Sequence, residues 1–479
     1  MINFNTTYLD LPTDFYVRNN PEKLSHPSLL LFNEALAEHE LNLNICSSSR
    51  EDLACFFAGQ KLSNSTTCIS LVYAGHQFGY FVPQLGDGRA HLLGEVLNAK
   101  GMRFDIQLKG SGQTAFSRGG DGKSALGPVL REYIVSEAMH YLGVPTTRAL
   151  AAVQTGEFVQ RETLLPGAIL ARVAASHLRI GTFEYFANRK DLPSLKLLFD
   201  YSVKRHYPEL IGQDNLHLLF LDKVLNSYAK MLASWMSFGF IHGVMNTDNM
   251  SISGQTLDYG PCAFIDNFAF DRVFSSIDHA GRYAYNNQIF IAKWNFSQLA
   301  SCFIPFIHSN EKIAIGILQE FLEDHFSCFE EKWMEAMGKK LGFFKVDKNG
   351  EQVIHNWLLY LQEENLDFTM SFRDIIDRPK NFKRTPLFQL FESSWHTCLQ
   401  QQPQSIKQSQ DLMKSVNPLF IPRNHQIQRA IDLASKGDFT VVNDLIQVAK
   451  KPFLEQVNYL KYSISPKEEE RVKSTFCGT

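Results

Sequence analysis

The chain lacks paired cysteines. Its eight cysteines are scattered over 479 residues, and no two of them form a C-x-x-C pair. This spacing argues against a disulfide framework and is typical of reduced, intracellular proteins. We expect most of these thiols to be small core side chains. Cys477, third from the end, keeps two interpretations, a redox handle or an inert tail residue.

Long apolar runs and basic tracts are also missing. Stretches such as FIPFI at 303–307 fall far short of the ~20 residues of a membrane span. The first residues carry neither a basic segment followed by an apolar core nor an Arg-rich transit sequence. The net charge is −3 without any long Lys/Arg tract, which argues against nucleic acid or a membrane as partner. We therefore expect a cytoplasmic protein of the bacterial cytosol.

The overall amino-acid composition is that of a protein with a large folded core. Hydrophobic residues make up 44% of the chain and charged residues 20%, as in ordinary soluble globular proteins, and the 38 phenylalanines predict an aromatic-rich core. Short strand-like runs and glycine turns come first, and long helical periods follow. This segregation predicts an α+β, bilobal fold with a cleft, the layout of a protein kinase.

The same patterns divide the chain into three parts. We expect a strand-rich N-lobe over 1–175, a helical C-lobe over 176–400 and a helical C-terminal extension over 411–479. The polar segment QQQPQSIKQSQ at 400–410 is expected to be an exposed linker.

Local periodicity predicts individual elements within the N-lobe. TCISLVYAGHQFG at 67–79 and AHLLGEVLN at 90–98 are expected to be strands around the turn QLGDGR. Residues 104–109 alternate between apolar and polar side chains, as in a strand with two different faces. The apolar spacing at 126–142 predicts a helix that ends before a Gly and a Pro.

The segment HGVMNTDNMSISGQTLDYGP, 242–261, has the rhythm of a kinase catalytic loop followed by D-F-G. His242 and Asn249 stand seven apart, as the kinase His and Asn do, and the triplet that begins at Asp258 resembles D-F-G. Val244 occupies the position of the kinase catalytic Asp. The motif therefore predicts a kinase-like site without the kinase base, with His242 as a buried scaffold residue.

The same loop offers oxygen ligands and a carboxylate base. Asn249 and Asp258 are linked by MSISGQTL, which can form a short hairpin. Their oxygens suit Mg²⁺ or Mn²⁺, with nucleotide phosphates completing the shell. Asp248 could accept a proton from a hydroxyl nucleophile, although a turn-forming Asp is the alternative.

Several cationic side chains could hold phosphates. Lys109 ends the alternating strand, like the kinase lysine that reaches the nucleotide and pairs with a helix Glu, and Glu132 and Glu137 are available on the next helix. The alternative is a solvated strand-end lysine. Arg172 and Arg179 flank the junction of the two halves and could clamp a triphosphate, although ordinary surface arginines are the alternative.

Two glycine-rich loops complete the candidate set. In GDGR, Gly86 and Gly88 allow close approach to a phosphate and Arg89 adds a forked donor, unless this is a plain hairpin turn. SRGGDGKSALG at 117–127 imitates a Walker A loop, but Ser117 stands where the first glycine is required. We reject a P-loop NTPase and keep a phosphate-binding nest as an option.

These motifs resemble the selenoprotein O-like protein adenylyltransferases, a family with a pseudokinase fold. The likeness covers 73–95, 105–150, 171–186, 242–261 and 278–288, and NPLFIPRN at 417–424 extends it. The resemblance implies a kinase-like fold that binds ATP in a flipped orientation. It implies transfer of AMP, with UTP as a further donor in some members, to Ser, Thr and Tyr hydroxyls of proteins while pyrophosphate leaves.

The resemblance also implies roles for individual residues. Asp248 would accept the proton, Glu132 would pair with Lys109, and Asn249 and Asp258 would bind Mg²⁺ or Mn²⁺. The nucleotide would be held by Gly86, Gly88, Arg89, Lys109, Asp121, Gly122, Arg172, Arg179 and Asp258. The roles of Asp121 and Gly122 rest on the resemblance alone. Eukaryotic members carry a selenocysteine near the C-terminus, where this chain has Cys477.

Two other functions stay open from the residues. A kinase-like phosphotransferase would share the fold and the metal pair but would want a base at Val244. A non-catalytic, nucleotide-binding pseudokinase scaffold would have no need of the full set of Lys109, Asn249 and Asp258.

Overall fold

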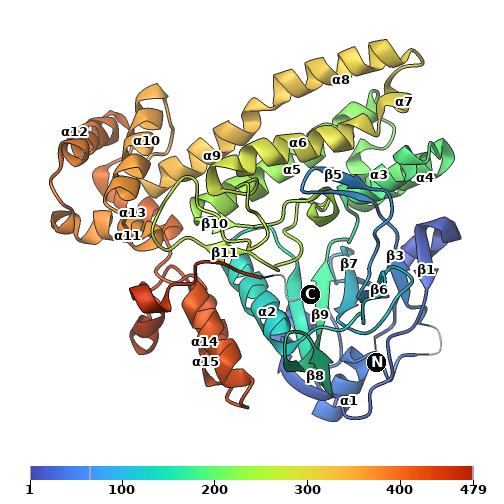
Figure 1. Ribbon diagram of the computed structural model, residues 1–479. Coiled ribbons are helices and arrows are strands. Elements are labelled where there is room, and N and C mark those ends of the chain that lie inside the picture. The colour runs from blue at the N-terminus through green and yellow to red at the C-terminus, as the bar shows by residue number, and fades with distance from the viewer. Residues whose placement is uncertain (1, 64–65, 477–479) are drawn as a thin grey trace.

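The computed structural model describes residues 2–63 and 66–476, with strands first and helices after them (Figure 1). Seven strands form one antiparallel sheet in the order β1–β3–β6–β7–β9–β8–β2. In that order they are Tyr16–Arg18, Ile69–Leu71, Ala90–Leu97, Arg103–Lys109, Leu164–Ala174, Arg148–Gln160 and Ser28–Phe32. The predicted α+β class is confirmed. The kinase-like fold and the three-part division stay predictions, and Cys477 lies outside the described residues.

The strand predicted over 67–79 is wrong in its extent. The structure has two short strands there, β3 and β4 (Gly75–Gln77), and they belong to different sheets. The chain leaves the large sheet after Leu71 because the N–H of Ala74 donates to the carbonyl of Gly181 at 2.9 Å. β4 then pairs with β5 (Tyr80–Val82) as a hairpin. The second small ribbon joins β10 (Phe240–Ile241) and β11 (Ala263–Phe264).

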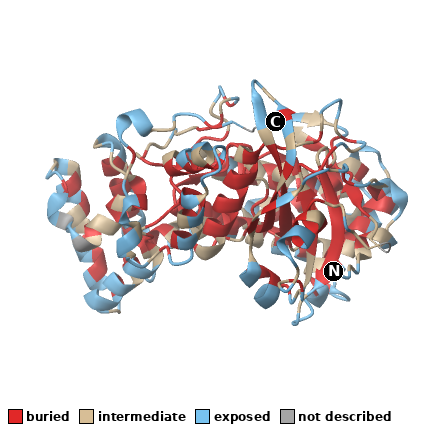
Figure 2. Ribbon diagram, turned by 90° about the horizontal axis from the view of Figure 1, so that it is seen from below, coloured by how far each residue is buried: buried red, intermediate tan, exposed pale blue. Residues whose placement is uncertain are grey.

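Helices pack on both faces of the large sheet. α1 (Arg50–Phe57) lies on one face, and α2 (Leu126–Tyr141), at the predicted position, lies on the other. Figure 2 shows the buried residues as a continuous band through the sheet and the neighbouring helices. Among the described residues, no helix has both the length and the apolar character needed to cross a membrane.

The second half is helical, as predicted. The helices there are Ile180–Asn188 (α3), Leu192–His206 (α4), Leu216–Ser237 (α5), Gln288–Ser301 (α6), Ile304–Ile307 (α7), Glu311–His325 (α8), Ser327–Lys340 (α9), Lys348–Glu363 (α10), Phe368–Asp377 (α11), Pro386–Gln401 (α12), Ile406–Val416 (α13), Asn424–Ala434 (α14) and Thr440–Ala449 (α15). α14 and α15 return to pack against α2 (Figure 1).

The polar linker predicted over 400–410 is mostly helix. α12 continues to Gln401 and α13 begins at Ile406. Ser405 and Gln408 form a capping box, in which each side chain accepts a hydrogen bond from the backbone of the other. Composition alone mistook the polar face of a surface helix for a linker.

Arg423 ties the start of α14 to the centre of the helical part. Its buried guanidinium donates to Asp266 at 2.9 Å and to Asp367, the N-cap of α11, at 2.8 Å. It also donates to the carbonyl of Ser463 at 3.1 Å. Three separate segments therefore depend on one side chain.

Removing Arg423 should strongly destabilise the fold. Arg423→Ala leaves two carboxylates without their cation, and we expect a loss of about 3–5 kcal/mol in the free energy of unfolding. Lys383→Ala is the matched control, because the Lys383–Glu364 pair has a lysine whose side chain is 72% exposed. Its loss should stay below about 1 kcal/mol. Urea denaturation of both variants measures the difference, and equal effects would contradict the role of Arg423.

Candidate active site

One cavity gathers nearly all of the predicted site residues. It has a volume of about 760 Å³ and lies between the large sheet, the two glycine-rich loops and the loop 244–261. Glu132 is the one predicted residue that does not line it, since it stands behind Lys109. The others all line it: Gly86, Gly88, Arg89, Lys109, Asp121, Gly122, Arg172, Arg179, Asp248, Asn249 and Asp258.

Asp258 is the electrostatic centre of this cavity. Arg172 Nη1 lies 2.7 Å from its Oδ1, Arg179 Nη1 lies 3.3 Å from its Oδ2, and Lys109 Nζ also binds Oδ1. Burial alone would raise the pKa of Asp258, but Arg172, Lys109 and Arg179 outweigh it and hold the pKa well below its usual range. The residue is ionised, and it keeps a backbone φ of 65°, a conformation that is strained for a non-glycine residue.

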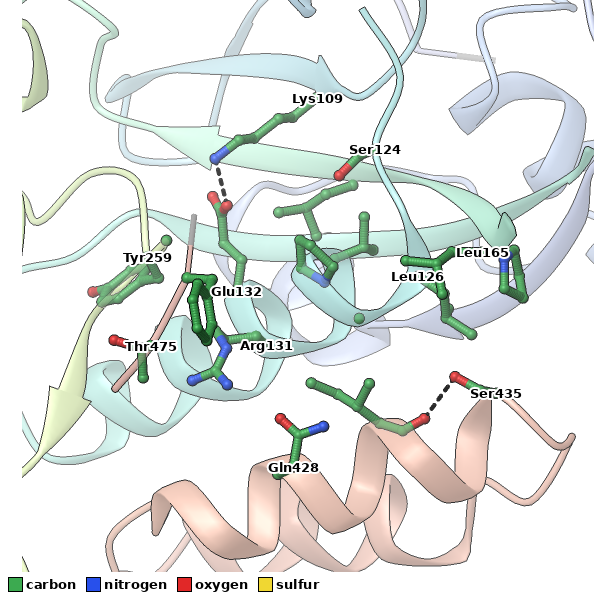
Figure 3. Close-up of a pocket in the computed structure, with 18 of the residues that line it drawn as sticks. Lys109, Ser124, Leu126, Arg131, Glu132, Leu165, Tyr259, Gln428, Ser435 and Thr475 are labelled. Atoms are coloured by element: carbon green, nitrogen blue, oxygen red, sulfur yellow. Dashed lines mark hydrogen bonds and ion pairs between the residues drawn. The ribbon is translucent and has the colours of Figure 1, made fainter. Parts of the chain in front are cut away.

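Glu132 of α2 neutralises the same cations from behind. Its Oε2 accepts a hydrogen bond from Lys109 Nζ at 2.7 Å (Figure 3). Its Oε1 lies 3.1 Å from Arg172 Nη1. Glu137, the other candidate, pairs with Arg148 instead, at 2.8 Å. The helix therefore supplies the predicted ion pair through Glu132.

Strand register explains how Lys109 and Arg172 meet. β7 pairs with β9 so that Gln107 stands opposite Arg172, and Gln107 Oε1 accepts from Arg172 Nη2 at 2.6 Å. Gln107 Nε2 donates to Asp87 at 3.0 Å, and Asp87 also pairs with Arg179 at 3.4 Å. Gln107 and Asp87 were missed from the sequence. Gln107 lies on the polar face of the strand predicted over 104–109 and Asp87 lies within the GDGR turn, but neither was assigned a role.

Asp248 lies in a short 3₁₀ turn, Thr247–Asn249, and is 8% exposed. Gln77 Nε2 donates to its Oδ2 at 3.3 Å, whereas its buried Oδ1 has no hydrogen-bond partner among the described residues. Burial raises the pKa of Asp248 to about 6, against the opposing effect of nearby Arg179. A carboxylate with one unpartnered oxygen is suited to accept a proton at neutral pH.

The rest of the loop serves as scaffold. His242 is fully buried, and its Nε2 donates to the carbonyl of Leu257 at 3.0 Å, as expected of a scaffold residue. Asn249 Nδ2 donates to the carbonyl of Val244 at 3.1 Å. Met250 and Thr256 form the bridge of the predicted short hairpin. Val244 itself lines the cavity with an apolar side chain.

The oxygen atoms near this loop fit a divalent cation. Asp248 Oδ1 has no partner, and Asn249 Oδ1 accepts no hydrogen bond recorded for the described residues. The carboxylate of Asp258, whose oxygens pair with Lys109, Arg172 and Arg179 in this structure, is the third hard oxygen donor that lines the cavity. Two carboxylates and an amide leave coordination positions for phosphate oxygens and water.

The glycine-rich loops pack on each other as well as on the cavity. A Cβ at Gly86 would lie 2.4 Å from the ring of Phe116, and one at Gly88 would lie 2.8 Å from the carbonyl oxygen of Phe116. A Cβ at Gly122 would lie 2.1 Å from the carbonyl oxygen of Gly112. Close packing of the loops is thus a second reason for these glycines, besides the approach of a phosphate that was predicted.

Two charged residues complete the rim. The guanidinium of Arg89 makes no ion pair with any residue in the described ranges, so it is available to an anion. Arg161 Nη1 lies 2.8 Å from Asp121 Oδ2, and Asp121 Oδ1 accepts a hydrogen bond from the N–H of Lys123 at 3.0 Å. Arg161 was missed because nothing local in the sequence distinguishes it.

Known proteins are similar to this chain over nearly its full length. The family model of the protein adenylyltransferase SelO matches residues 1–450. The chain belongs to this family. It is 46% identical over 482 residues to the protein nucleotidyltransferase YdiU of Nitrosococcus oceani, covering 99% of this chain and 97% of that one. The YdiU proteins of Brevibacillus brevis and Rhizobium meliloti are 46% and 45% identical, covering 100% and 99% of this chain and 98% and 99% of theirs.

Family membership makes the chain an enzyme, a protein nucleotidyltransferase of the AMPylating kind. It also implies ATP and proteins as substrates. The resemblance inferred from the motifs is thereby confirmed over the full chain.

Gly75 is a further residue that the sequence did not single out. It begins the hairpin of β4 and β5, which contacts the loop 244–261 where the N–H of His76 donates to Thr247 Oγ1 at 2.7 Å. A Cβ at Gly75 would lie 2.7 Å from Asp248 Oδ1. Asp248 can thus keep its position only beside a glycine.

Gly75→Ala should therefore displace Asp248 without disturbing the cations. We expect transfer activity to fall by about 10²-fold, as for a catalytic group moved by roughly 1 Å, with nucleotide affinity unchanged. Gly316→Ala in α8 is the control, because its Cβ would meet nothing within 4 Å. Rate and binding measurements on both variants test this, and full activity in Gly75→Ala would contradict the importance of this contact.

Proposed function

We propose that the enzyme transfers AMP from ATP to Ser, Thr or Tyr hydroxyls of other proteins and releases pyrophosphate. The observation that carries the proposal is the buried carboxylate of Asp248, with an unpartnered oxygen, in a cavity lined by cations and by the apolar Val244. Family membership supports the same class of reaction.

The cations of the cavity suit a polyphosphate. Arg172 and Arg179 offer forked donors, Lys109 offers a point charge, and Arg89 has no partner of its own among the described residues. In our proposal these four hold the phosphates, and the loops with Gly86, Gly88, Asp121 and Gly122 supply backbone and side-chain contacts. Asp258 orients three of the cations before the nucleotide arrives.

We further propose that Asn249 and Asp258 hold Mg²⁺ or Mn²⁺, next to the unpartnered oxygen of Asp248. A cation bound there would neutralise charge on the departing pyrophosphate. The side chains of this chain perform the other tasks. Asp258 and Glu132 fix Lys109, and Gln77 holds Oδ2 of Asp248, whose Oδ1 has no hydrogen-bond partner among the described residues.

The proposed reaction joins the acceptor hydroxyl to the α-phosphate of ATP and releases pyrophosphate. The acceptor hydroxyl loses its proton to Asp248, and its oxygen forms a bond to the α-phosphorus of ATP. The bond between that phosphorus and the bridging oxygen to the β-phosphate breaks, and pyrophosphate leaves with the electron pair. The product is a phosphodiester between AMP and the protein. This chemistry needs the α-phosphate near the acceptor, which corresponds to the flipped nucleotide in a kinase-like cleft.

Kinase chemistry and a scaffold role are the alternatives that the test separates. A kinase base at Val244 is absent, and a scaffold does not require an unpartnered buried carboxylate beside the proposed metal ligands. Neither alternative gains support from a specific observation.

Labelled nucleotides distinguish the three functions. With Mg²⁺ and a mixture of candidate acceptor proteins, α-labelled ATP should transfer label to protein and γ-labelled ATP should not. α-Labelled UTP, run in parallel, measures the second donor. γ-Label alone would favour a kinase, and bound nucleotide without transfer would favour a scaffold.

Asp248→Asn completes this experiment. It should lower the transfer rate by about 10²–10⁴-fold, the usual contribution of a general base, while nucleotide binding persists. Asp438→Asn, an exposed carboxylate outside the cavity, should transfer like the wild type. Full activity in Asp248→Asn would rule out Asp248 as the proton acceptor.

A further inference from the structure

A second cavity lies on the other side of the Lys109–Glu132 ion pair. It has a volume of about 380 Å³ and is bounded by α2, β9, α14 and the segment 472–476 (Figure 3). Thr475 fixes that segment, because its N–H donates to the carbonyl of Phe274 at 2.7 Å. The walls are largely apolar and include Leu126, Val129, Leu170 and Ile431.

Arg131 is a buried cation in these walls. It is 9% exposed and makes no hydrogen bond or ion pair recorded for the described residues, and its Nη1 is buried without a partner. In Figure 3 its guanidinium extends from α2 into the space toward α14, beside Gln428. Glu132, the next residue, turns the other way, to Lys109.

The other buried arginines show how unusual this is. Arg148, Arg172, Arg179 and Arg423 each contact two carboxylates. A buried guanidinium without a counter-charge is destabilising, because desolvation is not offset by any partner. Burial accordingly lowers the pKa of Arg131. Arg131 does not stabilise the fold through any ion pair recorded for the described residues, and it faces a cavity. It is therefore suited to bind an anion from outside the chain.

We propose that this cavity binds a small amphipathic carboxylate. Its anionic end would pair with the Arg131 guanidinium, and its hydrocarbon part would fill the apolar walls formed by α2, β9 and α14. The class follows from size and charge: a buried arginine without a counter-charge among the described residues, in a cavity with largely apolar walls, matches one carboxylate on a hydrocarbon body.

The surroundings disfavour a more highly charged ligand. Asp432 lines the same cavity and would repel a second negative charge. Lys109 also lines it, but Glu132 and Asp258 already neutralise this lysine. Arg89, which lines both cavities, belongs in our proposal to the nucleotide. A phosphate ester or a nucleotide therefore fits this second cavity less well than a monocarboxylate does.

Octanoate and its uncharged amide, octanamide, are the probes for this site. In calorimetry and thermal-shift measurements on the full chain, octanoate should bind about tenfold more tightly than octanamide, the margin of one charge-assisted pair. Equal affinities, or no octanoate binding at millimolar concentrations, would overturn the proposal.

Arg131→Met separates binding from folding. We expect the variant to lose the preference for octanoate and to melt at the same temperature as the unliganded wild type or higher, because an unpaired buried charge is removed. Octanoate binding that is unchanged in the variant would overturn the proposal. So would a melting temperature that falls, because the arginine would then support the fold.

Two further measurements test whether octanoate binds in this cavity. Ser435 is an exposed residue at the rim of the cavity, and Ser435→Trp should block octanoate, whereas Ser393→Trp, an exposed helix serine elsewhere, should not. Saturating Mg²⁺ and ATP should leave octanoate bound. Octanoate binding that survives Ser435→Trp, or competitive displacement by ATP, would place the probe elsewhere and overturn the assignment.

Discussion

The carboxylate of Asp258 is the interaction on which the site depends. It draws together a lysine from β7, an arginine from β9 and the arginine that begins α3, and these elements otherwise meet only through the sheet and its loops. The ion pairs around Asp258 balance in charge, three cations against three carboxylates: Lys109, Arg172 and Arg179 against Asp87, Glu132 and Asp258. The buried Asp248 adds a further carboxylate beside them. A polyphosphate entering this cluster adds only negative charge. Arg89 and a divalent cation are the remaining positive charges our proposal provides, which is a physical reason for nucleotide and metal to bind together.

The polar face of β7 shows how the sheet is joined to the helices. Three successive positions on that face are each bound: Asp105 by Arg205 at 2.7 Å, Gln107 by Arg172, and Lys109 by Glu132. Such buried polar groups are tolerable only when their hydrogen bonds are satisfied. The strand therefore fixes the orientation of the catalytic cations by polar contacts on one face, while its apolar face packs on the core beneath α1.

These contacts also explain which features the sequence could predict. Alternation at 104–109 and the apolar spacing at 126–142 are local, so β7 and α2 were found, and the spacing from His242 to Asp258 located the catalytic loop. Local patterns do not reveal partners far along the chain. Gln107 was not singled out because alternation cannot say what covers the polar face, and Gly75 matters only because Asp248 lies against it. The linker prediction was wrong over 406–410, where α13 begins, because the exposed side of this helix is as polar as a linker.

Helix α2 lines the second cavity and, through Glu132, also holds Lys109, which lines both cavities. Consecutive residues on a helix point about 100° apart, so Glu132 reaches the catalytic cations while Arg131 reaches the space beside α14. Glu132 is paired with two cations, whereas Arg131 has no ion-pair partner among the described residues. Any anion that pairs with Arg131 therefore binds to the same turn of helix that holds Lys109 in place. A shift of that turn would change the Lys109–Glu132 contact, and with it the geometry of the cations around Asp258. The C-terminal helices, which pack on α2 from outside, are thus part of the environment of the active site.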